Sequence, residues 1–146
     1  MSTTKLATFL TAFASTFLLA CSISRLPTIF LIKDGIHASA KLDKVSTNDA
    51  TQAHFVHAVL VLDRKDKKLK SVNLNCFTLT IKGVISDEIN VDSIASVLTD
   101  PYPADAEGRV QVPVYWVFSA KKTLNDRSLP SAQLGVKSGL DSCFRY

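Results

Sequence analysis

The sequence predicts an all-β fold, a small single-domain β-sandwich with an immunoglobulin- or transthyretin-like architecture and at most one short helix. Three observations favour this class: short apolar runs with period-two alternation recur along the chain, turn signals separate them, and only one segment has helical periodicity. The 146 residues contain no internal repeat and suffice for one domain with a hydrophobic core. An α+β fold is the alternative.

Each predicted strand is a short apolar or alternating segment that ends in turn chemistry. The apolar run 26–32 precedes Asp34-Gly35, a dipeptide that accepts positive φ and favours a tight turn. The stretch 43–52 is polar and lacks periodicity, so we expect a loop there. The strands are expected at residues 26–32, 36–42, 54–62, 72–81, 84–91, 110–118, 133–136 and 142–146.

Several of these strands carry a feature that predicts their surroundings. The apolar composition of 54–62 predicts a strand covered on both faces, and the charged stretch 63–68 predicts a hairpin connection to the next strand. In strand 72–81 the alternation changes phase beside Cys76, which indicates a β-bulge. Pro113 cannot donate a hydrogen bond to a ladder, so it predicts a sheet edge or a bulge.

Residues 92–98 are the one segment with the periodicity of a helical turn. Asp92 is suited to cap this turn, and Asp100-Pro101 would end it. Loops are expected at 101–108 and 121–130, before and after the clearest strand of the chain.

The first 20 residues differ in composition from the rest of the chain. A short polar start with Lys5 leads into 6–20, which contains no charged side chain. This length suits the apolar region of a signal peptide and is too short for a membrane-spanning helix, which needs about 20 apolar residues. Cutting after Ala20 would place the bulky Leu18 where a general signal peptidase needs a small residue.

Leu18-Leu19-Ala20-Cys21 resembles the lipobox of bacterial lipoproteins. The resemblance covers only the N-terminal segment that ends at Cys21. It implies cleavage before Cys21, a diacylglyceryl group on its thiol and a fatty acyl chain such as palmitate on the new amine. Ser22 stands where Asp would mark inner-membrane retention in many Gram-negative species, which implies the periplasmic face of the outer membrane. An ordinary signal cleaved after Ala14, an uncleaved anchor and a buried segment are the alternatives.

With this resemblance the chain divides into a signal peptide at 1–20, a lipidated tether with the first short strand at 21–35 and the sandwich domain at 36–146. Lipid on Cys21 also accounts for the odd number of cysteines, because Cys76 and Cys143 are then left as a pair. A disulfide between them would stabilise the fold by about 4 kcal/mol. Two separate buried thiols are the alternative.

The net charge of +4 and the residue types give little support to nucleic-acid or cofactor binding. Acidic and basic residues are interspersed, whereas nucleic-acid binding usually requires a dense basic stripe. No Cys-x-x-Cys, glycine-rich loop or Gly-x-Ser-x-Gly motif is present. His54 and His57 would face opposite sides of a strand, which disfavours a shared metal ion. We therefore expect no enzyme activity, cofactor, metal or nucleic-acid partner.

Two groups of side chains are candidates for contact with a protein partner. The first is the segment with the highest density of positive charge, and its simpler interpretation is a solvent-exposed hairpin tip. The second is a pair of tyrosines, one of which lies between two prolines. The simpler interpretation of that tyrosine is that its side chain folds over one end of the sandwich. These candidates are Arg64, Lys65, Lys67, Lys68, Tyr102 and Tyr115.

Taken together, these features predict a membrane-anchored envelope lipoprotein that binds a protein partner in a larger assembly, for example of the secretion type. The first alternative is a freely secreted domain that binds a ligand or a host protein. The second is a small hydrolase with a site that no sequence motif marks.

Overall fold

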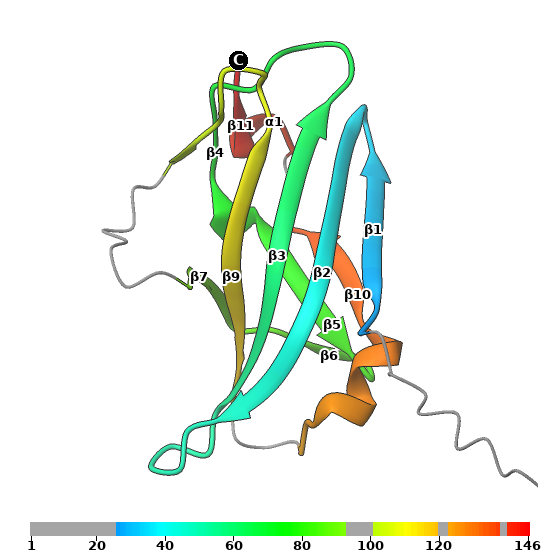
Figure 1. Cartoon of the computed structure of the whole chain (residues 1–146), viewed down its shortest axis with the longest axis vertical. Coiled ribbons are helices and arrows are strands. Elements are labelled where there is room, and N and C mark those ends of the chain that lie inside the picture. The colour runs from blue at the N-terminus through cyan, green and yellow to red at the C-terminus, as the bar shows by residue number, and fades with distance from the viewer. Residues whose placement is uncertain (1–25, 93–100, 120–122, 138–139) are drawn as a thin grey trace, which may run out of the picture.

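Three antiparallel sheets make up the part of the chain that the computed structural model describes, residues 26–92, 101–119, 123–137 and 140–146 (Figure 1). The largest sheet has five strands in the order β1-β2-β3-β9-β7. In that order the strands span Thr28–Lys33, Ile36–Thr47, His54–Arg64, Val110–Phe118 and Glu88–Val91.

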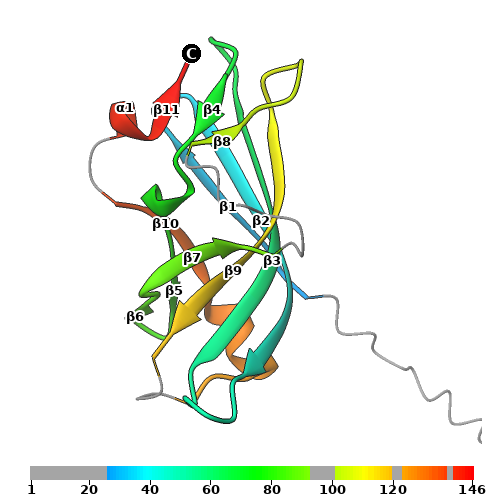
Figure 2. The same ribbon diagram turned by 90° about the vertical axis from the view of Figure 1, so that its left-hand side faces the viewer.

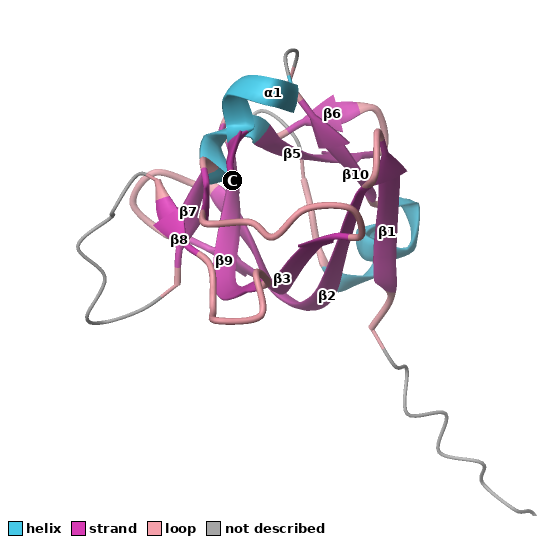
Figure 3. Ribbon diagram, turned by 90° about the horizontal axis from the view of Figure 1, so that it is seen from above, coloured by secondary structure: helices cyan, strands magenta, loops and turns pink. Residues whose placement is uncertain are grey.

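The other layer is formed by two three-stranded sheets, which lie on one side of the five-stranded sheet (Figures 2 and 3). The sheet β10-β5-β6 consists of Gln133–Val136, Phe77–Ile81 and Val84–Ile85. The sheet β11-β4-β8 consists of Phe144–Arg145, Ser71–Val72 and Tyr102–Pro103. Within the described ranges the helical elements are the 3₁₀ helices η1 (Leu74–Cys76) and η2 (Asp126–Ser131) and the α-helical turn α1 (Leu140–Cys143). The predicted all-β class is confirmed.

The hydrophobic core fills the space between the two layers. Along β9 every second side chain is buried, and Trp116, near the end of the strand, is 0% exposed. The indole nitrogen of Trp116 donates a hydrogen bond of 3.4 Å to the carbonyl of Phe77 in the opposite layer. Phe77 also packs edge-on against Phe144, so β5 and β11 share one core with β9.

The Asp34-Gly35 turn has the predicted geometry, with φ of 50° and 79° at the two residues. It joins β1 to β2 in a hairpin whose last pair is Lys33 with Ile36. Only a glycine or a small polar residue adopts these angles at low cost, which explains why the sequence signal was sufficient here.

The predicted loop at 43–52 was wrong over its first half. β2 continues to Thr47 because β3 pairs with it along this whole length, down to His54 opposite Thr47. A register shift between Leu42 and Lys44 leaves Asp43 as the extra residue of a β-bulge. Pairing with a neighbouring strand thus overrides the polar composition.

Two expectations about β3 were also wrong. Its side chains alternate between buried and half-buried, so the strand is sealed on one face only. The charged stretch after it is not a hairpin connection, since β4 pairs with β11 and β8 in a different sheet.

The phase change beside Cys76 has a different cause from the predicted bulge. The chain makes the 3₁₀ turn η1 there, and the side-chain oxygen of Asn73 accepts a hydrogen bond of 2.9 Å from the Asn75 N–H. The strand expected at 84–91 divides into β6 and β7, which belong to different sheets. The helical turn expected at 92–98 lies, apart from Asp92, outside the described residues.

The expectation that Pro113 lies on an edge strand or at a bulge was wrong, because β9 has neighbours on both sides and an uninterrupted register with β3. β9 lies between β3 and β7, but β7 pairs only as far as Val91 opposite Val114. The Asp92 N–H donates to the carbonyl of Pro113 at 2.8 Å. The nitrogen of Pro113 lies on the same side of the strand as its carbonyl, so it also faces β7. Because proline offers no N–H in return, the β7 ladder ends at this point.

Candidate binding face

The outer face of the five-stranded sheet is open to solvent, whereas its inner face holds the core. The strand register places His57 opposite Lys44 on β2 and opposite Tyr115 on β9, and Tyr115 opposite Asn90 on β7. Two shallow hollows of about 230 and 220 Å³ lie on this outer face. We define the outer face as the outward-pointing side chains of these five strands.

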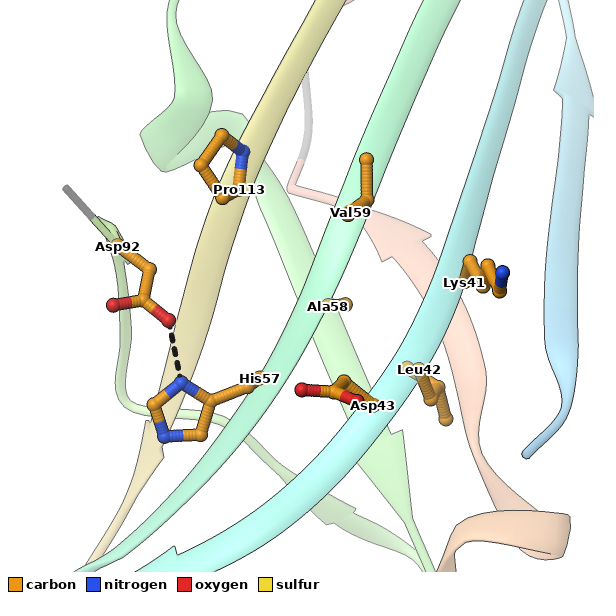
Figure 4. Close-up of a pocket in the computed structure, with 8 residues that line it drawn as sticks. All are labelled: Lys41, Leu42, Asp43, His57, Ala58, Val59, Asp92 and Pro113. Atoms are coloured by element: carbon orange, nitrogen blue, oxygen red, sulfur yellow. Dashed lines mark hydrogen bonds and ion pairs between the residues drawn. The ribbon is translucent and has the colours of Figure 1, made fainter. Parts of the chain in front are cut away.

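The first hollow crosses β2, β3 and β9 and combines charged and apolar side chains (Figure 4). Its floor is apolar and includes Val59 and Pro113, which are directly paired across β3 and β9. Charged groups surround this floor on two sides. They are Lys41, Asp43 and Asp92, with the imidazole of His57 beside them.

His57 links two other residues of the outer face by hydrogen bonds at both ring nitrogens. Its Nδ1 lies 2.6 Å from Asp92 Oδ2, and its Nε2 lies 2.9 Å from Ser46 Oγ. The His57 side chain is 17% exposed and that of Asp92 is 46% exposed. β2, β3 and the end of β7 therefore each contribute one member of a Ser46–His57–Asp92 chain.

The β-bulge at Asp43 is what brings Ser46 to the outer face. Before the bulge the even-numbered residues of β2, such as Leu42, point into the core. The extra residue reverses the alternation, so that Ser46 pairs with Phe55 and contacts His57 on the outside. His54, by contrast, is buried and bonds Thr47 at 3.0 Å on the inner face, which confirms that the two histidines face opposite sides.

The Ser46–His57–Asp92 chain has the connectivity of a hydrolase triad, with the serine at Nε2 and the carboxylate at Nδ1. Hydrolysis also requires N–H donors directed at the oxyanion that forms beside the serine. Ser46 lies in a paired strand, where backbone N–H groups point within the sheet plane and side chains stand perpendicular to it. The N–H of Ser46 is therefore not directed at such an oxyanion.

Aromatic side chains continue the outer face beside this chain. The Tyr115 ring packs edge-on against Phe55, with 5.6 Å between the centroids, and lies 5.8 Å from the His57 ring. Amphipathic aromatic groups on a half-buried surface are typical of protein interfaces.

The second hollow lies at the β1 edge of the same face. It is lined by the exposed Phe30 and Ile32 of β1, by Val61 of β3, and by His37 and Asp63 at its end. Phe30 and Ile32 are 71% and 72% exposed, which is high for apolar side chains in a sheet.

The structure places the two predicted tyrosines in different sheets. Tyr115 lies on the outer face, whereas Tyr102 on β8 pairs with Val72 of β4 and packs partly against the core. The two do not form one patch. Tyr115 points outward as expected, although β9 is not an end strand of its sheet.

The predicted basic segment lies at the end of β3 and is partly held in place by its neighbours. The Arg64 guanidinium bonds Asp66 at 2.6 Å and the hydroxyl of Tyr146, and it lies 4.9 Å from the centre of the Tyr146 ring. Lys67 lies 5.2 Å from the same ring. The hydrogen bond from Arg64 holds the pKa of the Asp66 carboxyl below its ordinary value. Lys65 and Lys68 are exposed.

The predicted disulfide between Cys76 and Cys143 is present, with 5.9 Å between the Cα atoms. It joins the end of η1 to the end of α1, and so links the two small sheets that cover the core. Cys21 lies outside the described residues.

Sequence reasoning missed Ser46 and Asp92 as partners of His57. Asp92 is 35 positions from His57 along the chain, and Ser46 reaches the outer face only through the bulge. The available signal was the strand predicted at 54–62, because residues three positions apart in a strand face opposite sides and this already placed His57 opposite to His54.

None of the helices in the described ranges has the length and hydropathy required to cross a bilayer. The same ranges contain no group of three or more histidine, cysteine, aspartate or glutamate side chains arranged to hold a metal ion. No protein-family profile, curated protein or solved structure matches this chain.

Proposed function

We propose that this protein is a non-enzymatic binding domain of the bacterial cell envelope that is held at a membrane by lipid on Cys21. In this proposal the outer face of the five-stranded sheet binds a protein partner in a larger envelope assembly. The observation that carries the proposal is the contrast between the two faces, since one is sealed by the core and the other leaves aromatic, histidine and carboxylate groups at the surface.

The composition of the outer face supports a protein partner. Tyr115, Phe55 and Val59 supply apolar surface, while Lys41 and Asp92 supply charges of both signs beside it. Interfaces between proteins commonly combine aromatic with polar groups. The hollows are shallow and open, which suits a protein surface better than an enclosed small molecule.

The proposed anchor lies close to the sheet in sequence. The stretch from Cys21 to Thr28 spans at most about 25 Å when fully extended. A domain on a tether of this length would be confined near the membrane, which favours a partner that is itself part of the envelope.

The outer face is tested with a photo-reactive amino acid at Val59, in the full chain expressed in its source bacterium. The matched control carries it at Asn75, which is exposed on η1 in the opposite layer. We expect one discrete adduct of higher mass from Val59 and none from Asn75. Equal adducts from both positions, or none from either in a folded chain, would overturn the proposed binding face.

The anchor is tested by the mass and location of the protein. We expect the wild-type protein in the membrane fraction with acyl chains on a chain that begins at Cys21, and a Cys21→Ala form without them. Recovery of an unmodified wild-type protein from the culture supernatant would instead support the freely secreted binding domain.

A hydrolase is the second candidate because Ser46, His57 and Asp92 have the connectivity of a triad. A fluorophosphonate probe separates it from the binding domain. Absence of label on the wild-type chain supports the non-enzymatic proposal. Label that disappears in a Ser46→Ala variant would refute that proposal and establish Ser46 as a nucleophile.

A further inference from the structure

The β1 strand is a lightly protected edge of the five-stranded sheet, because its one charged residue, Lys33, lies at its end beside the turn, and β10 of the other layer lies next to it without forming a ladder. β1 pairs only with β2, and no other described strand forms a ladder with it. Thr28, Phe30 and Ile32 are exposed, and residues 28–32 carry no charge. Natural sheets usually protect such an edge with a charge, a bulge, a proline or a very short strand.

The opposite edge of the same sheet has more of this protection. β7 is shorter than β1, begins with the exposed Glu88, and its ladder ends at Pro113. The register of β1 with β2 is uninterrupted over all six residues of β1, with no bulge. The two edges therefore differ in their readiness to accept another strand.

The hairpin register identifies the backbone groups that face the open edge. Lys33 and Ile36 flank the two-residue turn, and the carbonyl of Pro27 accepts a hydrogen bond of 3.1 Å from Leu42. In an antiparallel ladder the hydrogen-bonded pairs alternate along the strand, so the odd-numbered residues bond β2. The N–H and C=O groups of Thr28, Phe30 and Ile32 consequently point away from the sheet.

We propose that β1 pairs with β1 of a second copy of this chain, antiparallel and centred on Phe30. In this register Phe30 lies opposite Phe30 of the second copy, and Thr28 lies opposite its Ile32. Every outward backbone group of these residues then has a complementary partner, and the exposed apolar side chains lie against one another.

The charges of the strand fit this register. The only charged residue of β1 is Lys33, and antiparallel pairing places the two lysines at opposite ends of the new ladder. Like charges therefore do not meet, and the two-fold symmetry closes the assembly at a dimer. The five-stranded sheets of the two copies would become continuous, and their outer faces would form one surface.

The proposal is tested by cysteine cross-linking of the full chain in isolated membranes, with copper phenanthroline as oxidant. A hydrogen-bonded antiparallel pair holds its Cα atoms about 5.5 Å apart, which suits a disulfide. We expect Phe30→Cys to convert most of the chain to a covalent dimer. Thr28→Cys and Ile32→Cys should give one only when both variants are present together.

Two controls keep this test independent of the proposed partner. The wild-type chain gives the background from its own cysteines. Ile85→Cys places a thiol at another exposed apolar position, 62% exposed on β6, and should add nothing to that background. Cross-linking of Ile85→Cys to the same extent as Phe30→Cys would refute a specific pairing. A Phe30→Cys adduct with the mass of a different protein would also refute the pairing. The same holds if Phe30→Cys is not cross-linked and its thiol is protected by lipid from aqueous maleimide.

A second measurement removes the contact instead of trapping it. Sedimentation of the detergent-solubilised full chain should show a dimer, and Phe30→Lys should convert it to a monomer because two ammonium groups would then face each other. Ile85→Lys should leave the dimer intact. A wild-type chain that sediments as a monomer at every concentration would overturn the self-pairing and leave the photo-crosslinking result at Val59 unaffected.

Discussion

Trp116 and Tyr115 are neighbours on β9, yet they lie on opposite faces of the sheet and meet different surroundings. Trp116 is fully buried and its indole N–H bonds the carbonyl of Phe77 in the opposite layer. Tyr115 is half-buried and contacts only Phe55 and His57 among the aromatic rings of the described residues. Side chains of the inner face thus pack against a second layer, while those of the outer face pack against one another.

This difference separates the side chains that stabilise the fold from those that remain accessible at the surface. Among the described residues, no buried side-chain nitrogen or oxygen lacks a hydrogen-bond partner. On the outer face, the carboxylate of Asp92 and the ring of Tyr115 remain partly accessible despite their contacts. Substitutions on the two faces should accordingly separate stability from binding.

The largest effect is expected from Trp116→Ala. Loss of a fully buried indole should lower the free energy of unfolding by about 4 to 5 kcal/mol, because a cavity replaces its contacts. Tyr115→Ala should cost about 1 kcal/mol or less, since the site is already open to water. Urea denaturation of the two variants measures both values, and equal losses would contradict the contrast between the faces.

The disulfide is expected to have the next largest effect, because it holds together the layer that covers the inner face. It closes a loop with a sequence separation of 67, and the loss of a bridge of this length costs about 4 kcal/mol. The double variant Cys76→Ala, Cys143→Ala should show this loss in urea denaturation, with or without reductant. Cys21→Ala is the matched control and should retain the wild-type stability until reductant is added.

The features that could be predicted from the sequence are those encoded within a few neighbouring residues. The alternation in β9, the Asp34-Gly35 turn and the opposite orientation of His54 and His57 all have this local origin. The cysteine pair followed from counting and from the resemblance of the N-terminal segment to a lipobox.

The features that could not be predicted depend on how distant strands pair. Residues 43–47 are polar, but they form part of β2 because β3 offers them a partner. The bulge at Asp43 then decides that Ser46 faces His57, and the end of the β7 ladder decides where Asp92 lies. Hydrophobic periodicity carries no information on either point, so the Ser46–His57–Asp92 chain was missed.

The smallest effect is expected at the end of β3, outside both faces, where Arg64 lowers the pKa of the Asp66 carboxyl. A carboxyl with a depressed pKa in the folded state stabilises the fold above its unfolded pKa of about 4. That contribution is lost as the pH falls through the lower folded pKa. Asp66→Asn should therefore be slightly less stable than wild type at neutral pH, and the difference should vanish at strongly acidic pH.

Thermal melts across this pH range measure the difference in stability, and a difference that stays constant with pH would show that the Asp66 charge is not its cause. High salt should shrink the difference at neutral pH, because the pair lies at the surface where ions screen it.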